Sequence, residues 1–480
     1  MSLKVFNTLS RSEEEFIPMK DKTVKMFVCG QTPYDDAHLG HARNYIIFDV
    51  IANWLRHEGY KVTYVQNITD IDDKIINKAK EKNMTPEELE RTYEKRFLED
   101  METIGVKQGV TEYLRSHDYI DTIRYQIQML LDRDYAYDLD GDIYFDVDKF
   151  KDYTKLSGMK LEELQKHRIE PKEGKKNVYD FALWKAAKPG EPSWEIELII
   201  GGKTKKFIGR PGWHIEDTAM TYKVFGPQYD LHGGASELIF PHHTNEIAQA
   251  EAAFGKKPFV KYWVHVGVLN INNVKMSKSL KNFITIRDTL KKYDPEALRL
   301  LMVSSNYRKE INYTDNMMKE SEKKLNYLYN TLNMLYNYPE IKEKDKDEDE
   351  ILAKINTFST EFTDLMNANF NTSVALMRLI SAMTQIRQYL ESHEGITKES
   401  KSYILSKILE YAGIFGILKK DFYKEPLQKE VKELIQKRDS FRKDKNFEEA
   451  DKIRKLIKDN YKINLEDTEY GTVWYKDREK

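Results

Sequence analysis

The sequence predicts an α/β fold in which an insertion divides one parallel sheet, followed by an α-helical region. Short apolar strands alternate with helices through the first third of the chain, and this alternation favours a parallel sheet. From about residue 109 the alternation gives way to helices and hairpins, and it returns from Gly212 to Val303. Beyond Tyr313 the chain is helical nearly to its end. We therefore expect a sheet domain at 1–312 that carries an insertion at about 109–208.

The first strands and helices follow from apolar runs and from the turns between them. Val24 to Cys29 is typical of a buried strand, Gly30 to Asp36 is typical of a turn, and Ala42 to Arg56 has helical apolar spacing. Lys61 to Asn67 is the next strand, and a later helix opens with a capping box that begins at Thr85. The chain therefore passes from a strand through a turn directly into a helix.

The insertion is marked by hairpin signals. Asp140 and Gly141 predict one hairpin, and Gly201 and Gly202 predict another. Strands resume afterwards, and the sequence places them near Tyr229 to His232 and Tyr262 to Val266. The two halves together predict a split nucleotide-binding sheet of the Rossmann type.

The residues after 312 divide into an α-helical bundle at 313–425 and a small C-terminal region at 426–480. A charged loop at Lys342 to Glu350 interrupts the bundle. Lys429 to Lys462 contains twelve Lys or Arg against eight Asp or Glu, which predicts a modest basic surface. Charge alone favours an ordinary solvated pair of amphipathic helices there.

Length and composition indicate a large cytoplasmic enzyme. The 480 residues carry a formal net charge of -2, so the whole chain has no general attraction to nucleic acid. A single cysteine excludes a disulfide framework and suits a reducing compartment. We see no signal-peptide pattern and no apolar run near the ~20 residues of a membrane span, so we expect no membrane association.

The first candidate site lies at the start of the helix that follows the first strand. His38 and His41 flank Leu39 and Gly40 there. Free backbone N–H groups at a helix start attract phosphate, a glycine permits close approach, and imidazoles can donate hydrogen bonds to phosphate oxygens. Two surface histidines at a helix start are an equally good interpretation of this segment alone.

The second candidate site is the loop Lys275 to Ser279, in which Lys275 and Lys278 stand three residues apart with serines beside them. Such a loop can close over a leaving pyrophosphate, although alone it would be taken for a solvated loop. Because both segments flank one alternating α/β region in this order, they predict a site that binds the triphosphate of ATP. The chemistry indicated is nucleotidyl transfer.

The third candidate site surrounds the only cysteine. Cys29 ends the first strand, where parallel sheets bind their ligands. His242 and Glu246 are four residues apart on one helical face, as two metal ligands would be, and Asp217 is a possible fourth. Taken singly, each of these residues is better explained as a core or capping residue.

These segments together resemble the class I cysteinyl-tRNA synthetases over nearly the full length of the chain. The resemblance is carried by the following residues: Cys29, Gly30, Thr32, Pro33, Tyr34, His38 to His41, Arg43, Asn67, Thr69, Asp70, Asp72 to Lys74, Gly209 to Glu216, His232 to Gly234, Phe240 to Glu246, Lys275 to Ser279, Asn369 to Thr372 and Gly471 to Trp474.

The resemblance implies a two-step reaction. The carboxylate of cysteine attacks the α-phosphate of ATP to give cysteinyl-adenylate and pyrophosphate, and a ribose hydroxyl at the end of tRNA(Cys) then takes the cysteinyl group. This chemistry depends on alignment and charge neutralisation. By the resemblance, the catalytic residues are His38, His41, Lys275 and Lys278, with Mg²⁺ accompanying ATP. The nucleotide-binding residues are Gly40, His41, Gly233, Gly234, Glu237 and Lys278.

The resemblance also implies one zinc ion, held by Cys29, Asp217, His242 and Glu246. Zinc lowers the pKa of a bound thiol enough to bind it as a thiolate, whereas a serine hydroxyl would have to become a far more basic alkoxide. Cysteine is therefore selected over serine without editing. The amino-acid pocket would comprise Cys29, Thr69 and Trp213. The family has a second cysteine where this chain has Asp217, which makes the site harder and more tolerant of other divalent ions.

Two smaller departures from the family accompany this one. The segment Glu195 to Phe207 is longer than usual, and Glu237 stands where aspartate is typical.

The family further implies a monomer and an anticodon-binding tail. The tail residues that match are Arg442, Asp451, Arg454, Asp467 and Trp474. Two alternatives share the core: a ligase that joins cysteine to an amino sugar, and an inactive tRNA-binding relative. The helical region and the Trp474 ending weigh against the first alternative, and the intact phosphate-binding segments weigh against the second.

Overall fold

The computed structural model describes residues 2–159, 172–276, 282–344, 346–424, 427–468 and 471–476. These residues form two compact units. The sheet unit contains Ser2–Lys291 and Tyr307–Asn312, and the helical unit contains Lys292–Asn306 and Tyr313–Lys480. The helix α8, Pro295–Val303, thus belongs to the helical unit, although it precedes the predicted boundary at residue 312.

The sheet unit is built on a five-stranded parallel sheet with the strand order β12-β11-β3-β4-β5. This confirms the predicted parallel sheet and the return of its second half after the insertion. Its strands are β3 Thr23–Gln31, β4 Lys61–Ile68, β5 Glu112–Arg115, β11 Tyr229–Ala235 and β12 Val260–Val266.

The strand β5 was not predicted, and it extends the sheet past the residue at which we placed the start of the insertion. Of its four residues only Leu114 is buried, so the strand has no apolar run that would announce it. It pairs in parallel with β4 from Val65 to Ile68, and this pairing shows that it belongs to the sheet.

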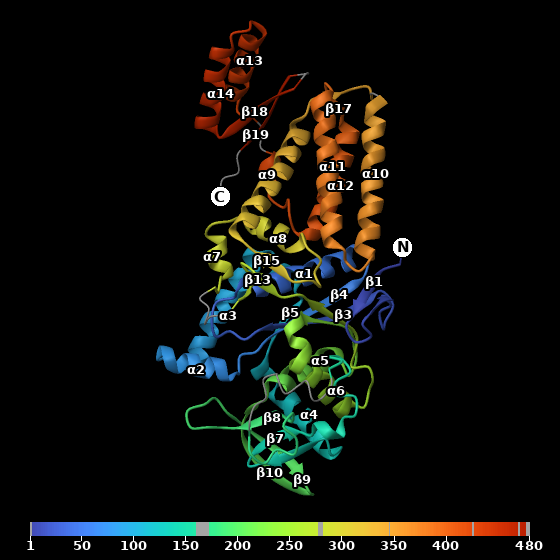
Figure 1. The fold of residues 1–480 in the computed structure, drawn as a ribbon, viewed down its shortest axis with the longest axis vertical. Coiled ribbons are helices and arrows are strands. Elements are labelled where there is room, and N and C mark those ends of the chain that lie inside the picture. The colour runs from blue at the N-terminus through green and yellow to red at the C-terminus, as the bar shows by residue number, and fades with distance from the viewer. Residues whose placement is uncertain are drawn as a thin grey trace. The chain divides into compact units, whose positions relative to one another are not determined.

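Helices cover the sheet. The helix α1, Leu39–His57, packs against β4, β11 and β12, and α5, Trp213–Phe225, packs against β3. Figure 1 shows the strands between α1 on one side and α5 with α6, Thr244–Phe254, on the other. Both faces of the sheet are therefore buried, which is why strands such as β3 are nearly continuous apolar runs.

The insertion forms a second, antiparallel sheet with the order β6-β7-β8-β10-β9. Both predicted hairpins are present. Asp140 and Gly141 join β6 to β7, Gly201 and Gly202 join β9 to β10, and all four residues have the positive φ that such turns require. The strands are β6 Ala136–Leu139, β7 Asp142–Phe145, β8 Phe181–Ala186, β9 Trp194–Ile200 and β10 Lys203–Pro211.

The remaining elements of the sheet unit are short strands and surface helices. The short strands and surface helices are β1 Lys4–Asn7, β2 Ser12–Glu15, α2 Asp73–Lys82, α3 Pro86–Thr103, α4 Ile120–Asp132, β13 Leu269–Ile271, β14 Val274–Lys275, α7 Ile286–Leu290 and β15 Ile311–Tyr313. The predicted capping box is present at the start of α3, where the side chains of Thr85 and Glu88 each accept a hydrogen bond from the backbone N–H of the other residue.

Long helices make up most of the helical unit, as predicted. They are α8, α9 Asp315–Asn337, α10 Lys346–Asn367, α11 Thr372–Ser392, α12 Lys398–Phe415, α13 Lys429–Lys443 and α14 Phe447–Tyr461. The predicted charged loop at Lys342 to Glu350 is corrected in its second half, because α10 already includes Lys346 to Glu350. Acidic side chains in the first turn of a helix are stabilised by the helix dipole, so this acidic run starts a helix.

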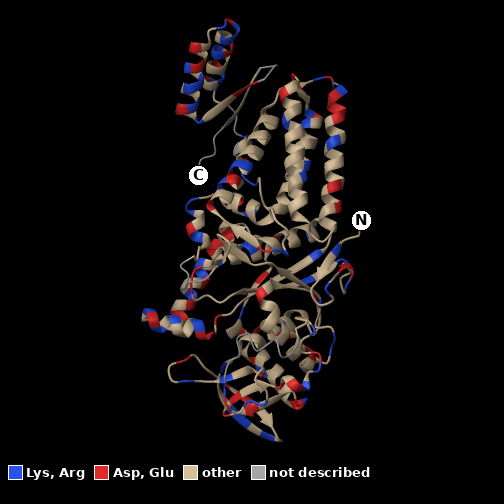
Figure 2. Ribbon diagram, in the orientation of Figure 1, with Lys and Arg blue, Asp and Glu red and all other residues tan. Residues whose placement is uncertain are grey.

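The C-terminal region is a helix pair with a two-stranded sheet that we did not predict. The strands are β18, Ile463–Thr468, and β19, Gly471–Lys476. Figure 2 shows basic and acidic residues interspersed along α13 and α14. This mixture fits the modest excess of positive charge counted in the sequence.

Candidate active site and metal centre

Polar side chains gather at the carboxyl ends of neighbouring parallel strands. Cys29 lies near the end of β3, Asn67 near the end of β4, and His232 at the middle of β11. This edge is where an open parallel sheet binds its ligands. Cys29 also belongs to the apolar core that joins the sheet to α5 and α6, so it stands between the core and the site.

The structure brings together all four residues predicted as metal ligands. The thiol of Cys29, the carboxylates of Asp217 and Glu246 and the imidazole of His242 have ligand atoms within 4.8 Å of one another. His242 Nε2 is 2.9 Å from Glu246 Oε1 and 3.1 Å from Asp217 Oδ2, and Cys29 Sγ is 3.5 Å from that same Oδ2. All four side chains are buried.

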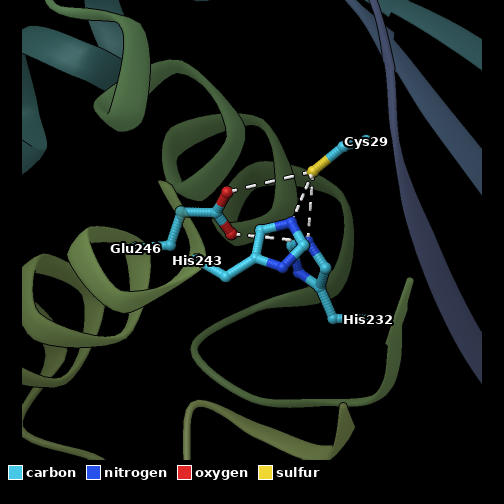
Figure 3. A group of neighbouring side chains, drawn as sticks. All are labelled: Cys29, His232, His243 and Glu246. Atoms are coloured by element: carbon cyan, nitrogen blue, oxygen red, sulfur yellow. Dashed lines mark hydrogen bonds and ion pairs between the residues drawn. The ribbon is translucent and has the colours of Figure 1, made fainter. Parts of the chain in front are cut away.

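A second group overlaps the first and was not predicted. Figure 3 shows Cys29 and Glu246 facing His232 and His243, and these four also have ligand atoms within 4.8 Å of one another. Cys29 Sγ is 3.1 Å from His243 Nε2 and 3.3 Å from His232 Nε2. Both histidines belong to the family pattern, but neither was predicted as a ligand: His243 stands beside the predicted ligand His242, and His232 lies in the middle of β11.

The three imidazoles of the two groups, those of His232, His242 and His243, are each oriented by a contact at Nδ1. His242 Nδ1 lies 2.8 Å from His214 Nδ1, and His243 Nδ1 lies 2.8 Å from His265 Nε2. His232 Nδ1 lies 2.6 Å from the hydroxyl of Tyr229. These contacts direct the three Nε2 atoms at the Cys29 cluster, as partners of metal-binding histidines do. None of His214, His265 and Tyr229 was predicted to have this role.

The electrostatics of the cluster fit a bound cation. Burial raises the pKa of the Cys29 thiol well above its usual value, and the carboxylates of Glu246 and Asp217 raise it further. Burial alone would lower the pKa of His242, but Glu246 and Asp217 outweigh burial and raise it to about 9. Among the described residues, Oε2 of Glu246 accepts no hydrogen bond, and its ion-pair contact with His232 Nε2 is as long as 3.5 Å. A buried set of one sulfur, one nitrogen and two carboxylates is a donor set that zinc accepts.

His38 and His41 lie at the predicted helix start. His38 is the N-cap of α1, where its side chain accepts the backbone N–H of His41, and the side chain of His41 accepts that of His38. The two rings stack with centroids 3.7 Å apart. A Cβ at Gly40 would come within 2.9 Å of the His38 ring, so the glycine makes room for that ring. Both histidines therefore cap the start of α1, the terminus at which the sequence predicts phosphate binding.

The two glycines predicted to face the nucleotide also have packing roles. A Cβ on Gly233 would lie 2.3 Å from the ring of Phe48 on α1, and one on Gly234 would lie 2.7 Å from the ring of His243. Helix packing and the histidine cluster therefore require glycine at both positions, whatever the ligand.

Lys275 and Glu237 form an ion pair and line one cavity of about 610 Å³. Trp213, His214 and Phe240 line the same cavity. This volume suits a small substrate. Lys278, with Ser277 and Ser279, lies outside the described residues.

The predicted amino-acid pocket residues adjoin the cluster. Trp213 stacks on His242 with ring centroids 4.1 Å apart. Thr69 is buried, and its hydroxyl accepts a hydrogen bond from Asn67 at 3.1 Å. The same Asn67 side chain donates to Asp217 at 2.7 Å. Asn67 was noted as part of the family pattern, but no role was predicted for it.

The predicted tail residues lie in the C-terminal region, and several are engaged within it. Asp467 binds the buried Arg438 at 2.6 Å and Arg442 at 2.9 Å, and Arg454 donates to the carbonyl of Leu465. Trp474 packs against the small core of this region, whereas Asp451 is exposed. Asp467 therefore has a structural role as an acceptor for buried arginine.

Comparison with known proteins defines the class. Residues 15–323 match the family described as "tRNA synthetases class I (C) catalytic domain". Solved structures with this fold include a methionyl-tRNA synthetase of Mycobacterium tuberculosis, with a TM-score of 0.56 and 14% identity over 82% of this chain and 89% of that one. A leucyl-tRNA synthetase complex of Agrobacterium radiobacter has a TM-score of 0.58 and 11% identity, over 86% of this chain and 87% of that one. The chain belongs to the class I tRNA synthetases.

Full-length relatives narrow the assignment. A cysteine–tRNA ligase of Thermococcus onnurineus is 44% identical over 99% of this chain and 99% of its own length. A cysteine–tRNA ligase of Thermococcus kodakarensis is 45% identical, also over 99% of this chain and 99% of its own length. Within its class, the chain therefore belongs to the cysteine–tRNA ligase family.

Proposed function

We propose that the chain activates L-cysteine with ATP and transfers the cysteinyl group to the terminal adenosine of tRNA(Cys). The observation that carries the proposal is the buried Cys29–Asp217–His242–Glu246 cluster, which lies beside the cavity that Trp213 and Lys275 line. A site that combines a metal-binding donor set with a nucleotide-binding sheet edge suits selection and activation of a thiol amino acid.

In the first step the carboxylate oxygen of cysteine bonds to the α-phosphorus of ATP, and the bond to pyrophosphate breaks. His38 and His41 at the start of α1 hold the phosphates while charge moves onto the leaving group. By the family resemblance, Lys275 and Lys278 neutralise that charge, and Mg²⁺ accompanies the nucleotide. In the second step a ribose hydroxyl of tRNA attacks the carbonyl carbon, and AMP leaves. Alignment and preorganised charge supply the acceleration.

Four residues would hold one zinc ion: Cys29, Asp217, His242 and Glu246. When bound, zinc favours the thiolate form of the substrate cysteine, whereas a serine hydroxyl would remain neutral. Trp213 and Thr69 adjoin the proposed zinc site and would enclose the side chain of the substrate cysteine. Because binding itself separates the two amino acids, no editing site is needed.

The helical unit and the C-terminal region would bind the rest of the tRNA. The tail residues proposed for the anticodon are Arg442, Asp451, Arg454, Asp467 and Trp474. We further propose a cytoplasmic monomer. None of the helices in the described part of the chain is long and apolar enough to cross a bilayer.

The proposal is tested by pyrophosphate exchange into ATP and by charging of a tRNA(Cys) transcript. Exchange should require cysteine and should be far weaker with serine at equal concentration, and charging should follow only with cysteine. An amino-sugar ligase would give cysteine-dependent exchange but no charging, and an inactive relative would give neither. Equal exchange with serine would contradict the role proposed for the metal.

A further inference from the structure

We infer that Asn67 is a positioning residue that makes Asp217 a one-oxygen ligand of the metal centre. The inference rests on the proposed metal site. Asn67 Nδ2 donates to Oδ1 of Asp217 at 2.7 Å. The other oxygen, Oδ2, faces the cluster, 3.1 Å from His242 Nε2 and 3.5 Å from Cys29 Sγ. The two oxygens of one carboxylate are thus divided between an amide and the metal centre.

A carboxylate needs such a partner more than a thiolate does. A thiolate offers one donor atom, whereas a carboxylate offers two equivalent oxygens and can rotate between one-oxygen and two-oxygen binding. Because three other protein ligands and the substrate thiol would share the metal, only one oxygen of Asp217 is needed. The amide of Asn67 occupies Oδ1 and so selects Oδ2 as the ligand atom.

Burial and hydrogen bonds fix the side chain of Asn67 in place. It is 2% exposed and lies near the end of β4. Its Oδ1 accepts the backbone N–H of Gly30, the residue that follows Cys29, and its Nδ2 also donates to Thr69 at 3.1 Å. A Cβ on Gly30 would lie 1.7 Å from the Asn67 carbonyl oxygen, so glycine is what lets β3 and β4 approach here. One amide therefore orients Asp217 relative to Cys29 and to the amino-acid pocket.

The test is a double-mutant cycle on metal binding with Asn67→Ala and Asp217→Cys, singly and together. Metal affinity is measured by chelator competition for zinc, and ligand geometry by the absorption spectrum of the cobalt(II)-substituted protein. In the Asp217 background we expect Asn67→Ala to weaken zinc about 10- to 100-fold and to shift the cobalt bands. In the Asp217→Cys background the same change should weaken zinc by less than about threefold, because a thiolate has no second oxygen to restrain.

Several results would overturn the inference. Equal losses in both backgrounds would mean that Asn67 acts through the Gly30 backbone, and no loss in either would mean that Asp217 needs no partner. If the unsubstituted chain binds neither zinc nor cobalt, the proposed metal site fails and the positioning role fails with it. Circular dichroism checks folding, and if Asn67→Ala does not fold, Asn67→Ser, which is too short to reach Asp217, gives the same comparison.

Discussion

The indole ring of Trp213 stacks on the imidazole of His242, with centroids 4.1 Å apart and planes inclined by 17°. Trp213 is the first residue of α5, and His242 lies in the turn that leads into α6. The stack therefore holds two helix starts together and keeps Nε2 of His242 directed at Glu246, 2.9 Å away. Trp213 also lines the cavity beside the cluster of Cys29, Asp217, His242 and Glu246.

Replacing Trp213 by Ala should raise the KM for cysteine about tenfold or more while changing the KM for ATP little. Aromatic pairs of this kind contribute about 0.5–1.5 kcal/mol beyond their buried area, and the side chain also closes the pocket. Pyrophosphate exchange at varied cysteine and ATP concentrations checks this. Trp194→Ala, in the insertion strand β9, serves as the control and should change neither KM. Equal rises in both KM values would place Trp213 outside the amino-acid pocket.

Removing the Asp217 carboxylate should reduce bound zinc. We expect Asp217→Ala to weaken zinc about 100-fold or more, since a ligand is lost and a buried charge partner of His242 is lost with it. Metal analysis after dialysis against a weak chelator measures the effect. The control is Asp230→Asn, a buried carboxyl on β11 that accepts backbone N–H groups of Met19 and Lys25. Unchanged zinc and unchanged cysteine affinity would remove Asp217 from the ligand set.

Chelation should lower the thermal stability of the chain. A metal that binds only the native state adds about 2.7 kcal/mol when its free concentration is 100 times its dissociation constant, so removing it lowers Tm. Scanning calorimetry with and without a strong chelator measures the shift, and added zinc should reverse it. The variant Cys29→Ser should show a much smaller shift. An identical shift in that variant would mean that the chelated metal lies elsewhere.

The capping and phosphate-binding roles of His38 can be separated. His38→Ala should cost about 1 kcal/mol through the lost N-cap and should slow pyrophosphate exchange by about 100-fold. Asparagine is a good N-cap but has no imidazole, so His38→Asn should recover the stability and leave the exchange slow. Denaturant unfolding and exchange rates measured on both variants check this. Full recovery of exchange in His38→Asn would show that only the cap matters.

The C-terminal region should loosen in acid through Asp467. Hydrogen bonding to Arg438 holds the pKa of Asp467 below its usual 3.8. A carboxyl whose folded pKa is depressed stabilises the fold above its unfolded pKa, and this contribution is lost as the pH falls through the folded value. Amide hydrogen exchange in α13 and α14 should therefore rise below about pH 4 relative to Asp467→Asn. The variant should be less protected at neutral pH and less sensitive to acid, and parallel curves for both chains would contradict this account.

Helical spacing made part of the proposed metal site predictable. His242 and Glu246 are one turn apart, and that spacing alone placed them on one face, as the structure has them. Apolar runs likewise identified the strands β3, β4, β11 and β12, although their order in the sheet was not predicted. The four-residue β5 gave no such signal, because only Leu114 is buried.

Contacts between distant segments could not be inferred from local pattern. His232 and His243 approach Cys29 only because β11 pairs with β3 and because α6 begins beside them. Asn67 meets Asp217 across 150 positions of sequence, and nothing near either residue indicates the other. Local propensity also missed the hairpin β18–β19, whose strands follow the predicted helices.

Cys29 is the only cysteine in 480 residues, and it is 6% exposed. A thiol reagent therefore has a single target in the whole chain, and that target is a proposed metal ligand. The rate of alkylation in the native protein becomes a direct gauge of site occupancy, with no background from other thiols. If Cys29 is a metal ligand as proposed, oxidation of this one sulfur would be enough to disable amino-acid recognition.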